Sequence, residues 1–488
     1  MKRLFALLSG TMLLALGAAA QTPAQKYIDA QISKEPLSGA VWGILARRAD
    51  GTVLAEYNAH TRMVPASNLK LVTTGTALHA FGGNHRFRTS LAYTGTIQPD
   101  GTLDGDLYIV GGGDPTVGAQ DSIALKPEAL FWKWKTLLRK AGIQRIHGRV
   151  VGDGTRWEGH LEHASWAYDD LGTYYGPGSN ALCFYKNAID LDVSAGKEGA
   201  PVNVRQRYPD TPWMHFSSYA FTGPSGTGNS LYLYTTDLAP YAELRGSYAV
   251  ERRPKTEHFA NKYGALTCAY YFWKNLKETG WEVTGGYADI DRSGYLRGAD
   301  FVPMEKAGTP QEIGFTESPA LAEIVRETNV RSDNFYAESL LRAMGEAATQ
   351  VAVYDSCLVA EKAVLQGLGL DLGGLEQADG SGLSRMSYVS PGWMVDFLDA
   401  MKESPSFDAF LSSLPAPGEG TLRTVKFEGA ERFRMKSGSM GGVLCYSGYI
   451  LDEEGRPEVT FSFFTNNATA PMPQVRAVML RALSLLIP

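Results

Sequence analysis

The chain has 488 residues, 44% of them hydrophobic, and a formal net charge of −6. This length exceeds what one hydrophobic core usually holds, so we expect two or three domains. The acidic balance and the lack of an arginine-rich run argue against a nucleic-acid partner. The four cysteines lie far apart without a Cys-x-x-Cys pair, which excludes a disulfide scaffold and a cysteine zinc site. One disulfide in an oxidising compartment and four buried thiols are the two alternatives left open.

The first 20 residues are predicted to be a secretory signal peptide. Lys2 and Arg3 precede an apolar run that is too short to span a membrane comfortably. Ala18-Ala19-Ala20 offers small residues for cleavage after Ala20, with an uncleaved anchor as the alternative. No later stretch is long and apolar enough to cross a bilayer, so no transmembrane span is expected in the mature chain.

A short helix is predicted over residues 26–33, and strands over residues 40–46 and 52–57 form a hairpin through a Asp-Gly turn. The hairpin leads into Pro65-Ala66-Ser67-Asn68-Leu69-Lys70, which has the pattern of a first helical turn. Residues three apart lie on one helix face, so the Ser67 hydroxyl and the Lys70 amine can meet. A partly desolvated lysine can lose its proton and act as a base toward such a hydroxyl. Alone, the pattern more often marks a capping serine followed by a solvated lysine.

From about residue 86 the chain is predicted to be β-rich. Short strands alternate with turns rich in glycine and aspartate, helices are expected over 128–142 and 257–279, and the strand over 146–152 ends in Asp153-Gly154. Residues 187–255 have no helical periodicity at all. The triple glycine at 111–113 lacks the Lys-Ser/Thr of a phosphate loop, so nucleotide binding is not expected.

Two further clusters of polar residues lie in the last third of the chain. Ser332-Asp333-Asn334 falls at a break between two predicted helices, where a plain capping cluster is the alternative. Lys436-Ser437-Gly438-Ser439 follows a predicted strand at 433–435, where a strand-end turn with an exposed lysine is the alternative. No histidine occurs after His258 and there is no Gly-x-Ser-x-Gly or His-Glu-x-x-His motif, so neither a histidine base nor a metal site is expected.

The order Ser-x-x-Lys, Ser-Asp-Asn, Lys-Ser-Gly resembles the signature of penicillin-interacting serine enzymes. More narrowly, the chain resembles the penicillin-binding protein 4 type of D-alanyl-D-alanine carboxypeptidase/endopeptidase. The long gap between Lys70 and Ser332 is similar to that family's large insertion, and residues 112–116 and 379–385 match stretches typical of it. Ser437 stands where many relatives have threonine, which keeps the hydroxyl and loses a methyl group.

The resemblance implies an α/β (α+β) fold with a transpeptidase/β-lactamase-like domain and β-rich inserted domains. The antiparallel sheet would combine residues near 40–57 with residues 433–465, and helices would flank it. Residues 21–85 and 300–488 would form the catalytic domain. Residues 86–186 and 256–299 would form the inserted domain, with 187–255 nested in it as a second β-rich insertion.

The same resemblance implies acyl transfer, with Ser67 as nucleophile and Lys70 as the proton acceptor. Ser332, supported by the charge of Lys436, would relay the proton to the leaving amine, and Asn334 would hold the substrate backbone. The expected catalytic residues are Ser67, Lys70, Ser332, Asn334 and Lys436. The expected substrate-binding residues are Ser437, Gly438, Ser439, Asp153 and Arg385. The last two are candidates for the cationic group of a peptide stem, with a structural turn residue as the alternative for each.

The implied partners are peptidoglycan peptides with D-Ala-D-Ala termini or crosslinks, and β-lactam antibiotics as covalent inhibitors, in the periplasm. No metal or organic cofactor is expected. Three alternatives remain: a β-lactamase-type hydrolase, a catalytically silent wall-binding scaffold, and a general esterase. The presence of all five expected catalytic residues argues against the scaffold. The long insertion between Lys70 and Ser332 argues against the β-lactamase.

Overall fold

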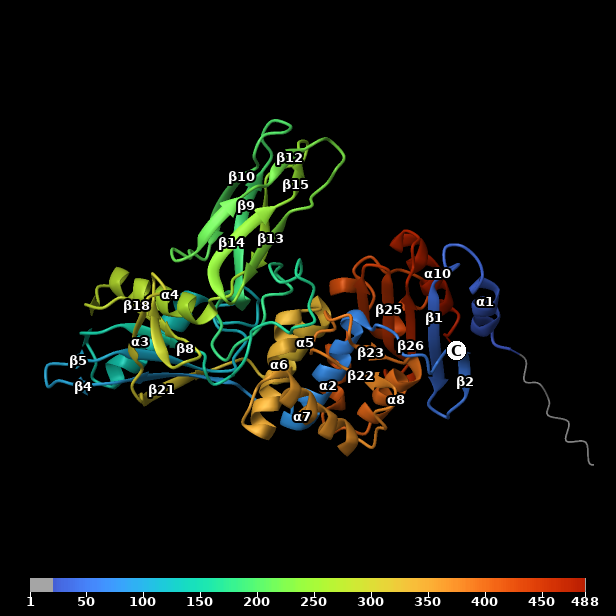
Figure 1. Cartoon of the computed structure of the whole chain (residues 1–488). Helices are drawn as coiled ribbons and strands as arrows, with labels where there is room; N and C mark the ends of the chain where they lie inside the picture. The colour runs from blue at the N-terminus through green and yellow to red at the C-terminus, as the bar shows by residue number, and fades with distance from the viewer. Residues whose placement is uncertain (1–20, 488) are drawn as a thin grey trace, which may run out of the picture.

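The computed structural model describes residues 21–487 and arranges them in three lobes (Figure 1). The signal peptide predicted over residues 1–20 lies outside the described residues. Within residues 21–487, no helix is long and apolar enough to cross a membrane. The first lobe is built on a five-stranded sheet, the second on a seven-stranded sheet, and the third on several small sheets.

The five-stranded sheet of the first lobe is antiparallel and joins the two ends of the chain. Its strand order is β2-β1-β26-β25-β24, which confirms the pairing expected between the early hairpin and the late strands. The strands are β1 (Val41–Arg48), β2 (Val53–Tyr57), β24 (Phe433–Met440), β25 (Val443–Leu451) and β26 (Pro457–Asn466).

Helices cover both faces of this sheet because its central strands are apolar on both sides. Along β25, Cys445 and Tyr449 face one core while Leu444 and Tyr446 face the other, as expected for side chains that alternate along a strand. Helices α1 (Pro23–Gln31) and α10 (Met472–Ser484) cover the second of these cores. The remaining helices of the lobe are α2 (Leu69–Phe81), α5 (Leu321–Arg331), α6 (Asn334–Thr349), α7 (Tyr354–Gly367), α8 (Pro391–Met401) and α9 (Phe407–Ser413).

Short elements complete this lobe around the helices. They are the 3-10 turns η1 (Ala66–Asn68), η3 (Gly420–Leu422) and η4 (Ala430–Arg432) and the strands β22 (Leu375–Glu376) and β23 (Tyr388–Val389). The α/β fold with a helix-flanked antiparallel sheet is therefore confirmed.

The second lobe has a mixed seven-stranded sheet in the order β20-β19-β18-β8-β6-β3-β21 and a small sheet in the order β17-β7-β5-β4. Its helices are α3 (Pro127–Lys140) and α4 (Gly264–Glu278). The strands are β3 (Arg88–Tyr93), β4 (Thr96–Ile97), β5 (Thr102–Asp104), β6 (Leu107–Gly112), β7 (Arg145–Ile146), β8 (Val150–Asp153), β17 (Glu282–Val283), β18 (Tyr287–Ile290), β19 (Tyr295–Gly298), β20 (Pro303–Lys306) and β21 (Gln311–Glu317).

Two features of the second lobe differ from the sequence expectation. Strand β21 pairs with β3, so the chain returns to the first lobe after Glu317 and not at residue 300. Residues 257–279 were expected to form one helix, but 257–260 belong to a strand that pairs with β9 and only Gly264–Glu278 is helical. The apolar spacing of α4 does not extend back into this strand, where Phe259 faces the core of the third lobe.

The third lobe stands away from the other two and consists of strands alone (Figure 1). Its sheets have the orders β10-β9-β16, β11-β14-β13 and β12-β15. The strands are β9 (Ala188–Ser194), β10 (Asn203–Tyr208), β11 (His215–Ser218), β12 (Phe221–Gly223), β13 (Tyr232–Thr236), β14 (Ala239–Arg245), β15 (Ser247–Ala249) and β16 (Lys255–Ala260).

The four cysteines are buried, and none of them forms a disulfide bond. They are Cys183, Cys268, Cys357 and Cys445. Of the two alternatives that the sequence left open, the structure therefore has the four buried thiols.

Arg342 of α6 fastens the first lobe to the long connection that follows β8. This connection, residues 154–184, leads to the turn η2 (Tyr185–Asn187), and we call it the β8–η2 loop. The Arg342 guanidinium is buried and donates hydrogen bonds to the carbonyl groups of Glu158, His160 and Ser179 within this loop. Carbonyl groups at three positions of the loop thus depend on one side chain.

We expect the Arg342→Ala substitution to lower the free energy of unfolding by on the order of 3 kcal/mol, because it removes a buried side chain and leaves several carbonyl groups without their donor. The urea midpoint of unfolding, followed by circular dichroism, measures the effect. The control is Arg205→Ala in β10, whose side chain is 80% exposed and should change stability by no more than about 0.5 kcal/mol. Equal effects of the two substitutions would contradict a structural role for Arg342.

Candidate active site

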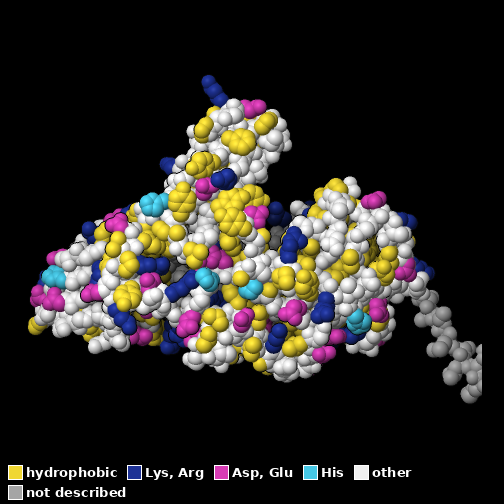
Figure 2. All heavy atoms as spheres, viewed as in Figure 1, with side chains coloured by type: hydrophobic (Ala, Val, Ile, Leu, Met, Phe, Trp, Pro, Cys, Tyr) yellow, Lys and Arg dark blue, Asp and Glu magenta, His cyan; other side chains and the backbone are white. Residues whose placement is uncertain are grey.

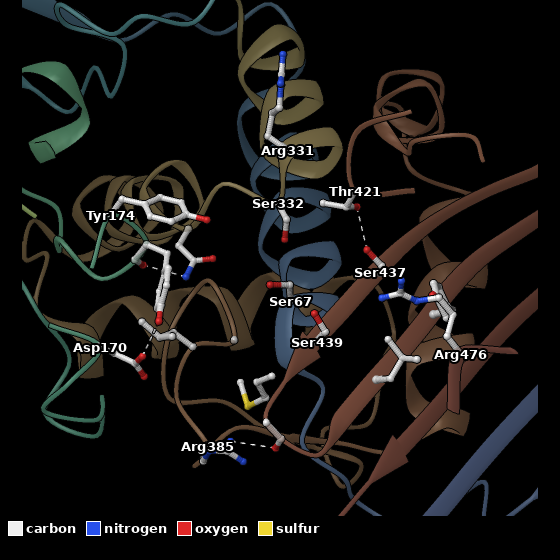
Figure 3. Close-up of a pocket in the computed structure, with 18 of the residues that line it drawn as sticks. Ser67, Asp170, Tyr174, Arg331, Ser332, Arg385, Thr421, Ser437, Ser439 and Arg476 are labelled. Atoms are coloured by element: carbon white, nitrogen blue, oxygen red, sulfur yellow. Dashed lines mark hydrogen bonds between the residues drawn. The ribbon is translucent and has the colours of Figure 1, made fainter. Parts of the chain in front are cut away.

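Ser67 lies in the turn η1 that joins the early hairpin to α2. The sequence predicted a first α-helical turn here, but the turn is 3-10 and Ala66 has a φ of +46°. This left-handed conformation of the residue before Ser67 is sterically unfavourable for alanine. Close packing holds it in place, since Ala66 is fully buried. The Ser67 side chain points into the cavity described below (Figure 3).

The amine of Lys70, which sits in the first turn of α2, is fully buried and hydrogen-bonded to three acceptors. Its Nζ lies 3.0 Å from Ser67 Oγ, 2.6 Å from Asn334 Oδ1 and 2.7 Å from the carbonyl oxygen of Ser381. The expected meeting of Ser67 and Lys70 is thus present. Burial lowers the pKa of Lys70 to about 8, although nearby carboxylates oppose the shift. Part of the Lys70 population is therefore neutral close to neutral pH.

Two carboxyl groups hold the loop that contains Ser381, whose carbonyl oxygen is the third acceptor of Lys70. The Glu338 carboxylate accepts hydrogen bonds from the backbone N–H groups of Gly380 and Ser381, at 3.1 and 2.7 Å. Asp379 accepts from the N–H groups of Gly382 and Ser384, at 2.9 and 2.7 Å. Burial and the nearby Asp379 raise the pKa of Glu338 to about 8, so burial opposes charge on both Glu338 and Lys70.

The Ser-Asp-Asn cluster lies, as expected, at the junction between α5 and α6. Ser332 ends α5 in the left-handed conformation with a φ of 60°, which turns the chain sharply. Asp333 caps α6 by accepting from the N–H of Tyr336 at 2.9 Å and pairs with Lys186 at 2.9 Å. Asn334 reaches Lys70 with its oxygen and donates from Nδ2 to the carbonyl oxygen of Tyr175 at 2.9 Å.

Lys436 faces this junction from strand β24. Its buried Nζ lies 2.8 Å from Ser332 Oγ and 2.6 Å from the carbonyl oxygen of Ser437. Burial and the neighbouring Lys70 hold the pKa of Lys436 well below its usual value. The Lys-Ser-Gly segment lies within β24 and not at its end, because residues 436–440 continue to pair with β25.

Gly438 allows β24 to pack directly against the turn that carries Ser67. A Cβ atom at this position would lie 2.7 Å from the carbonyl oxygen of Pro65 and 2.8 Å from the backbone nitrogen of Asn68. Any other residue would push the strand away from η1. Gly438 therefore sets the distance between the turn that carries Ser67 and the Lys-Ser-Gly segment of β24.

A cavity of about 520 Å³ opens between β24, the α5–α6 junction and the β8–η2 loop. Ser67, Ser332, Asn334, Ser437, Ser439 and Arg385 all line it, so the structure brings six of the expected residues to one place (Figure 3). The Ser437 hydroxyl donates to Thr421 Oγ1 at 2.9 Å, and Arg385 donates to the carbonyl oxygen of Gly441 at 3.1 Å. Lys70 and Lys436 lie behind this lining and contact it through Ser67 and Ser332.

Asp153 neither lines the cavity nor contacts a residue that does, unlike Lys70 and Lys436. Its carboxylate accepts from the N–H and the hydroxyl of Thr155, at 2.9 and 2.6 Å, and so stabilises the turn after β8. The carboxylate that does line the cavity is Asp170, which the sequence analysis missed. Asp170 accepts from the Tyr175 hydroxyl at 3.0 Å, and burial raises its pKa.

Arg476 is another charged lining residue that the sequence analysis did not predict. It belongs to α10, almost 40 residues after Ser439, yet its guanidinium lies beside Ser437 in Figure 3. Its Nε is buried without a hydrogen-bond partner, and no ion pair among residues 21–487 involves it. Nothing in the sequence around Arg476 distinguishes it from other arginines of an amphipathic helix.

The arrangement can deprotonate a serine hydroxyl, transfer an acyl group to it and bind a substrate with acidic and basic groups. Within residues 21–487 there is no cluster of three or more histidine, cysteine, aspartate or glutamate side chains that could hold a metal ion. The side chains that line the cavity offer hydroxyl, amide, guanidinium and carboxylate groups, with the amines of Lys70 and Lys436 behind them.

Comparisons with known proteins agree with this chemistry. A family model described as the D-Ala-D-Ala carboxypeptidase 3 (S13) family matches residues 24–484. A D-alanyl-D-alanine carboxypeptidase of Actinomadura sp. (strain R39) is 29% identical over 469 residues, which cover 93% of this chain and 82% of that protein. The D-alanyl-D-alanine carboxypeptidase DacB of Haemophilus influenzae is 25% identical over 479 residues, 94% of this chain and 91% of that protein.

The crystal structure of penicillin binding protein 4 from Haemophilus influenzae shares the fold. It aligns with a TM-score of 0.75 and 24% identity over 91% of this chain and 95% of that chain. The match of the family model extends through all three lobes and contains every residue that lines the cavity. The chain belongs to the D-Ala-D-Ala carboxypeptidase 3 (S13) family.

Proposed function

We propose that the chain is a serine D-Ala-D-Ala carboxypeptidase and DD-endopeptidase that acts on peptidoglycan stem peptides through an acyl-enzyme on Ser67. The observation that carries the proposal is the 3.0 Å contact between Ser67 Oγ and a buried Lys70 amine with a pKa of about 8. A lysine of this pKa can accept a proton near neutral pH, as a general base must. Membership of the S13 family supports the same reaction.

In the proposed acylation, Ser67 Oγ attacks the carbonyl carbon of the penultimate D-alanine while Lys70 accepts the hydroxyl proton. The backbone N–H groups of Ser67 and Ser439 stabilise the negative oxygen that develops. The peptide C–N bond then breaks, and the Ser332 hydroxyl gives a proton to the leaving amine. In this relay the proton that Lys70 took from Ser67 replaces the one that Ser332 gives up, so that Lys70 is neutral again. Lys436 Nζ, 2.8 Å from Ser332 Oγ, supports the relay by holding that hydroxyl in place. Water finally releases the acyl group from Ser67.

Two pairs of side chains in the cavity support recognition of the substrate. Arg476 and the Ser437 hydroxyl suit the carboxylate of the leaving D-amino acid, which lies on the β24 side of Ser67. Asp170 suits a stem residue with a cationic group, such as the free amine of a diamino acid, whereas Arg385, a cation itself, suits an acidic group on the stem. Asp170 thereby takes the role that the sequence analysis had given to Asp153.

The proposal also covers the compartment in which the protein works and the division of the chain into domains. The chain is secreted across the inner membrane by a signal peptide over residues 1–20 and works in the periplasm, where peptidoglycan lies. The first lobe is the catalytic domain, interrupted after residue 85 and resumed near Ser318. The second and third lobes are inserted domains.

β-Lactams inhibit the enzyme by acylating Ser67. A solved relative, penicillin binding protein 4 of Haemophilus influenzae, has been crystallised with a β-lactam.

Brief exposure to benzylpenicillin should add the mass of the antibiotic to the protein, and peptide mapping should place the adduct on Ser67. The Ser67→Ala variant should gain no mass, because the nucleophile is gone. Cleavage of uncrosslinked and crosslinked muropeptides by the wild type then measures the two peptidase activities. Rapid loss of penicillin without an adduct would instead indicate a β-lactamase, and inertness toward penicillin and muropeptides would indicate a scaffold protein.

The rate of acylation by benzylpenicillin should rise about tenfold per pH unit below pH 8 and level off above it. The reason is that Lys70 must be neutral to accept the Ser67 proton, and its pKa is about 8. Stopped-flow measurement of adduct formation between pH 5.5 and 9.5 gives the profile. In Lys70→Arg the guanidinium stays protonated, so acylation should fall by about 10²–10⁴-fold and lose this pH dependence. A flat wild-type profile would exclude Lys70 as the base.

Replacing Arg476 with alanine should lower kcat/KM about 10–100-fold for a peptide that ends in a free D-alanine carboxylate, because a charge-assisted hydrogen bond is lost. The same peptide with a C-terminal amide should be cleaved equally slowly by variant and wild type. The matched control is Arg481→Ala, an exposed arginine on the same helix. An equal loss on acid and amide peptides would mean that Arg476 only supports the fold.

A further inference from the structure

A groove on the third lobe has no role in the reaction described above. It has a volume of about 540 Å³ and lies over strands β13 and β14 and the turn between them. Three tyrosine rings, Tyr168, Tyr234 and Tyr241, line it together with Glu243 and Arg245. Figure 2 shows side chains of the hydrophobic class, tyrosine included, gathered at the foot of this lobe where it meets the rest of the molecule.

The tyrosines of the groove face solvent although the sheet beneath them has a closed core. Along β13, Leu233 and Thr235 are buried while Tyr234 points to the opposite side. Along β14, Ala242 and Leu244 are buried, whereas Tyr241 remains 48% exposed. The core of the lobe therefore does not need these rings, and an exposed aromatic cluster of this kind commonly marks a binding surface.

The side chains of the groove combine flat rings with a charged pair. Tyr168, from the β8–η2 loop, stacks on Tyr234 with ring centroids 5.3 Å apart and an angle of 26°. Glu243 and Arg245 form an ion pair at the edge of the groove, and Arg245 lies over the ring of Tyr219. Tyrosine rings offer an apolar face and a polar hydroxyl, and the ion pair offers both donors and acceptors. This mixture suits a saccharide, whose rings have C–H faces and a rim of hydroxyl and amide groups.

The groove is connected to the active-site cavity by one continuous loop. Tyr168 lies in the groove, and two residues later Asp170 lines the cavity, followed by Tyr174 and Tyr175. Tyr174 is 60% exposed, so aromatic surface continues from one site to the other. A polymer that presents peptides on a sugar chain could thus occupy both sites at once.

We propose that this groove binds the glycan strand of peptidoglycan while a stem peptide of the same polymer enters the active-site cavity. This inference rests on the proposed function, because that function makes peptidoglycan the substrate. The gain would come from effective concentration, since a peptide attached to a bound glycan reaches Ser67 as an intramolecular event. Soluble peptides without sugar would not benefit.

The test uses the full chain with the double substitution Tyr234→Ser/Tyr241→Ser, and Tyr241→Ser alone as a milder variant. Each protein is mixed with glycan strands whose stem peptides an amidase has removed, and binding is measured by affinity electrophoresis. We expect the double variant to bind these strands at least tenfold more weakly than the wild type, with Tyr241→Ser in between. The matched control is Tyr295→Ser on β19 of the second lobe, which is 43% exposed and should bind like the wild type.

Two readouts separate this proposal from the proposed function. Acylation of Ser67 by benzylpenicillin reports on the active site alone, and the double variant should react at the wild-type rate if it is folded. Hydrolysis of intact sacculi should fall several-fold in the double variant, whereas hydrolysis of a sugar-free stem peptide should not. Unchanged binding of glycan strands by the double variant would overturn the groove proposal. The proposal would also be overturned if the double variant lost self-association and not glycan binding, because a second copy of this chain would then be the occupant of the groove. Failure of the wild type to cleave any stem peptide would instead overturn the proposed function and leave the glycan-binding result standing.

Discussion

Lys70 is held away from water by acceptors from three separate parts of the chain: the Ser67 hydroxyl, the Asn334 amide oxygen and the Ser381 carbonyl oxygen. A buried ammonium group is stable only if it is hydrogen-bonded, and a base is useful only if it can lose a proton. Burial lowers the pKa of Lys70, the nearby carboxylates of Asp379, Glu338 and Asp333 raise it, and the balance is a pKa of about 8. The helix, the helix junction and the glycine-rich loop must therefore all be in place before Lys70 has this pKa.

The second lysine extends this constraint to the sheet. Lys436 is buried beside Lys70, and each disfavours a proton on the other, so the two amines are poorly able to be charged together. In the reaction that we propose, a proton taken from Ser67 by Lys70 and a proton delivered through Ser332 would thus be coupled by charge repulsion. Gly438 makes this arrangement possible, because it lets β24 approach η1 closely enough for Lys436 to reach Ser332.

Sequence alone predicted the parts of the site that obey local rules. The three-residue spacing of Ser67 and Lys70, the polar break at Ser332 and the pairing of early with late strands all follow from periodicity and chain order. Asp170 and Arg476 did not follow, because their places in the cavity depend on how a loop and a distant helix pack and not on any spacing. Asp153 was implied by the family resemblance, with a structural turn residue as the alternative, and here its carboxylate stabilises its own turn. The left-handed Ala66 was equally hidden, since no local pattern predicts a strained alanine.

The insertion contributes to the site through one loop. The chain leaves the first lobe at the C-terminal end of α2, whose first turn carries Lys70, and returns at the N-terminal end of α5, which Ser332 ends. The insertion therefore begins and ends about three helical turns away from these two residues. The β8–η2 loop nevertheless reaches the site: the Tyr175 carbonyl group accepts a hydrogen bond from Asn334, and Asp170 forms part of the cavity wall. Arg342 fixes the same loop to α6, the helix that Asn334 begins. A residue of the β8–η2 loop thus helps to fix Asn334 from a part of the chain that none of the three sequence elements includes.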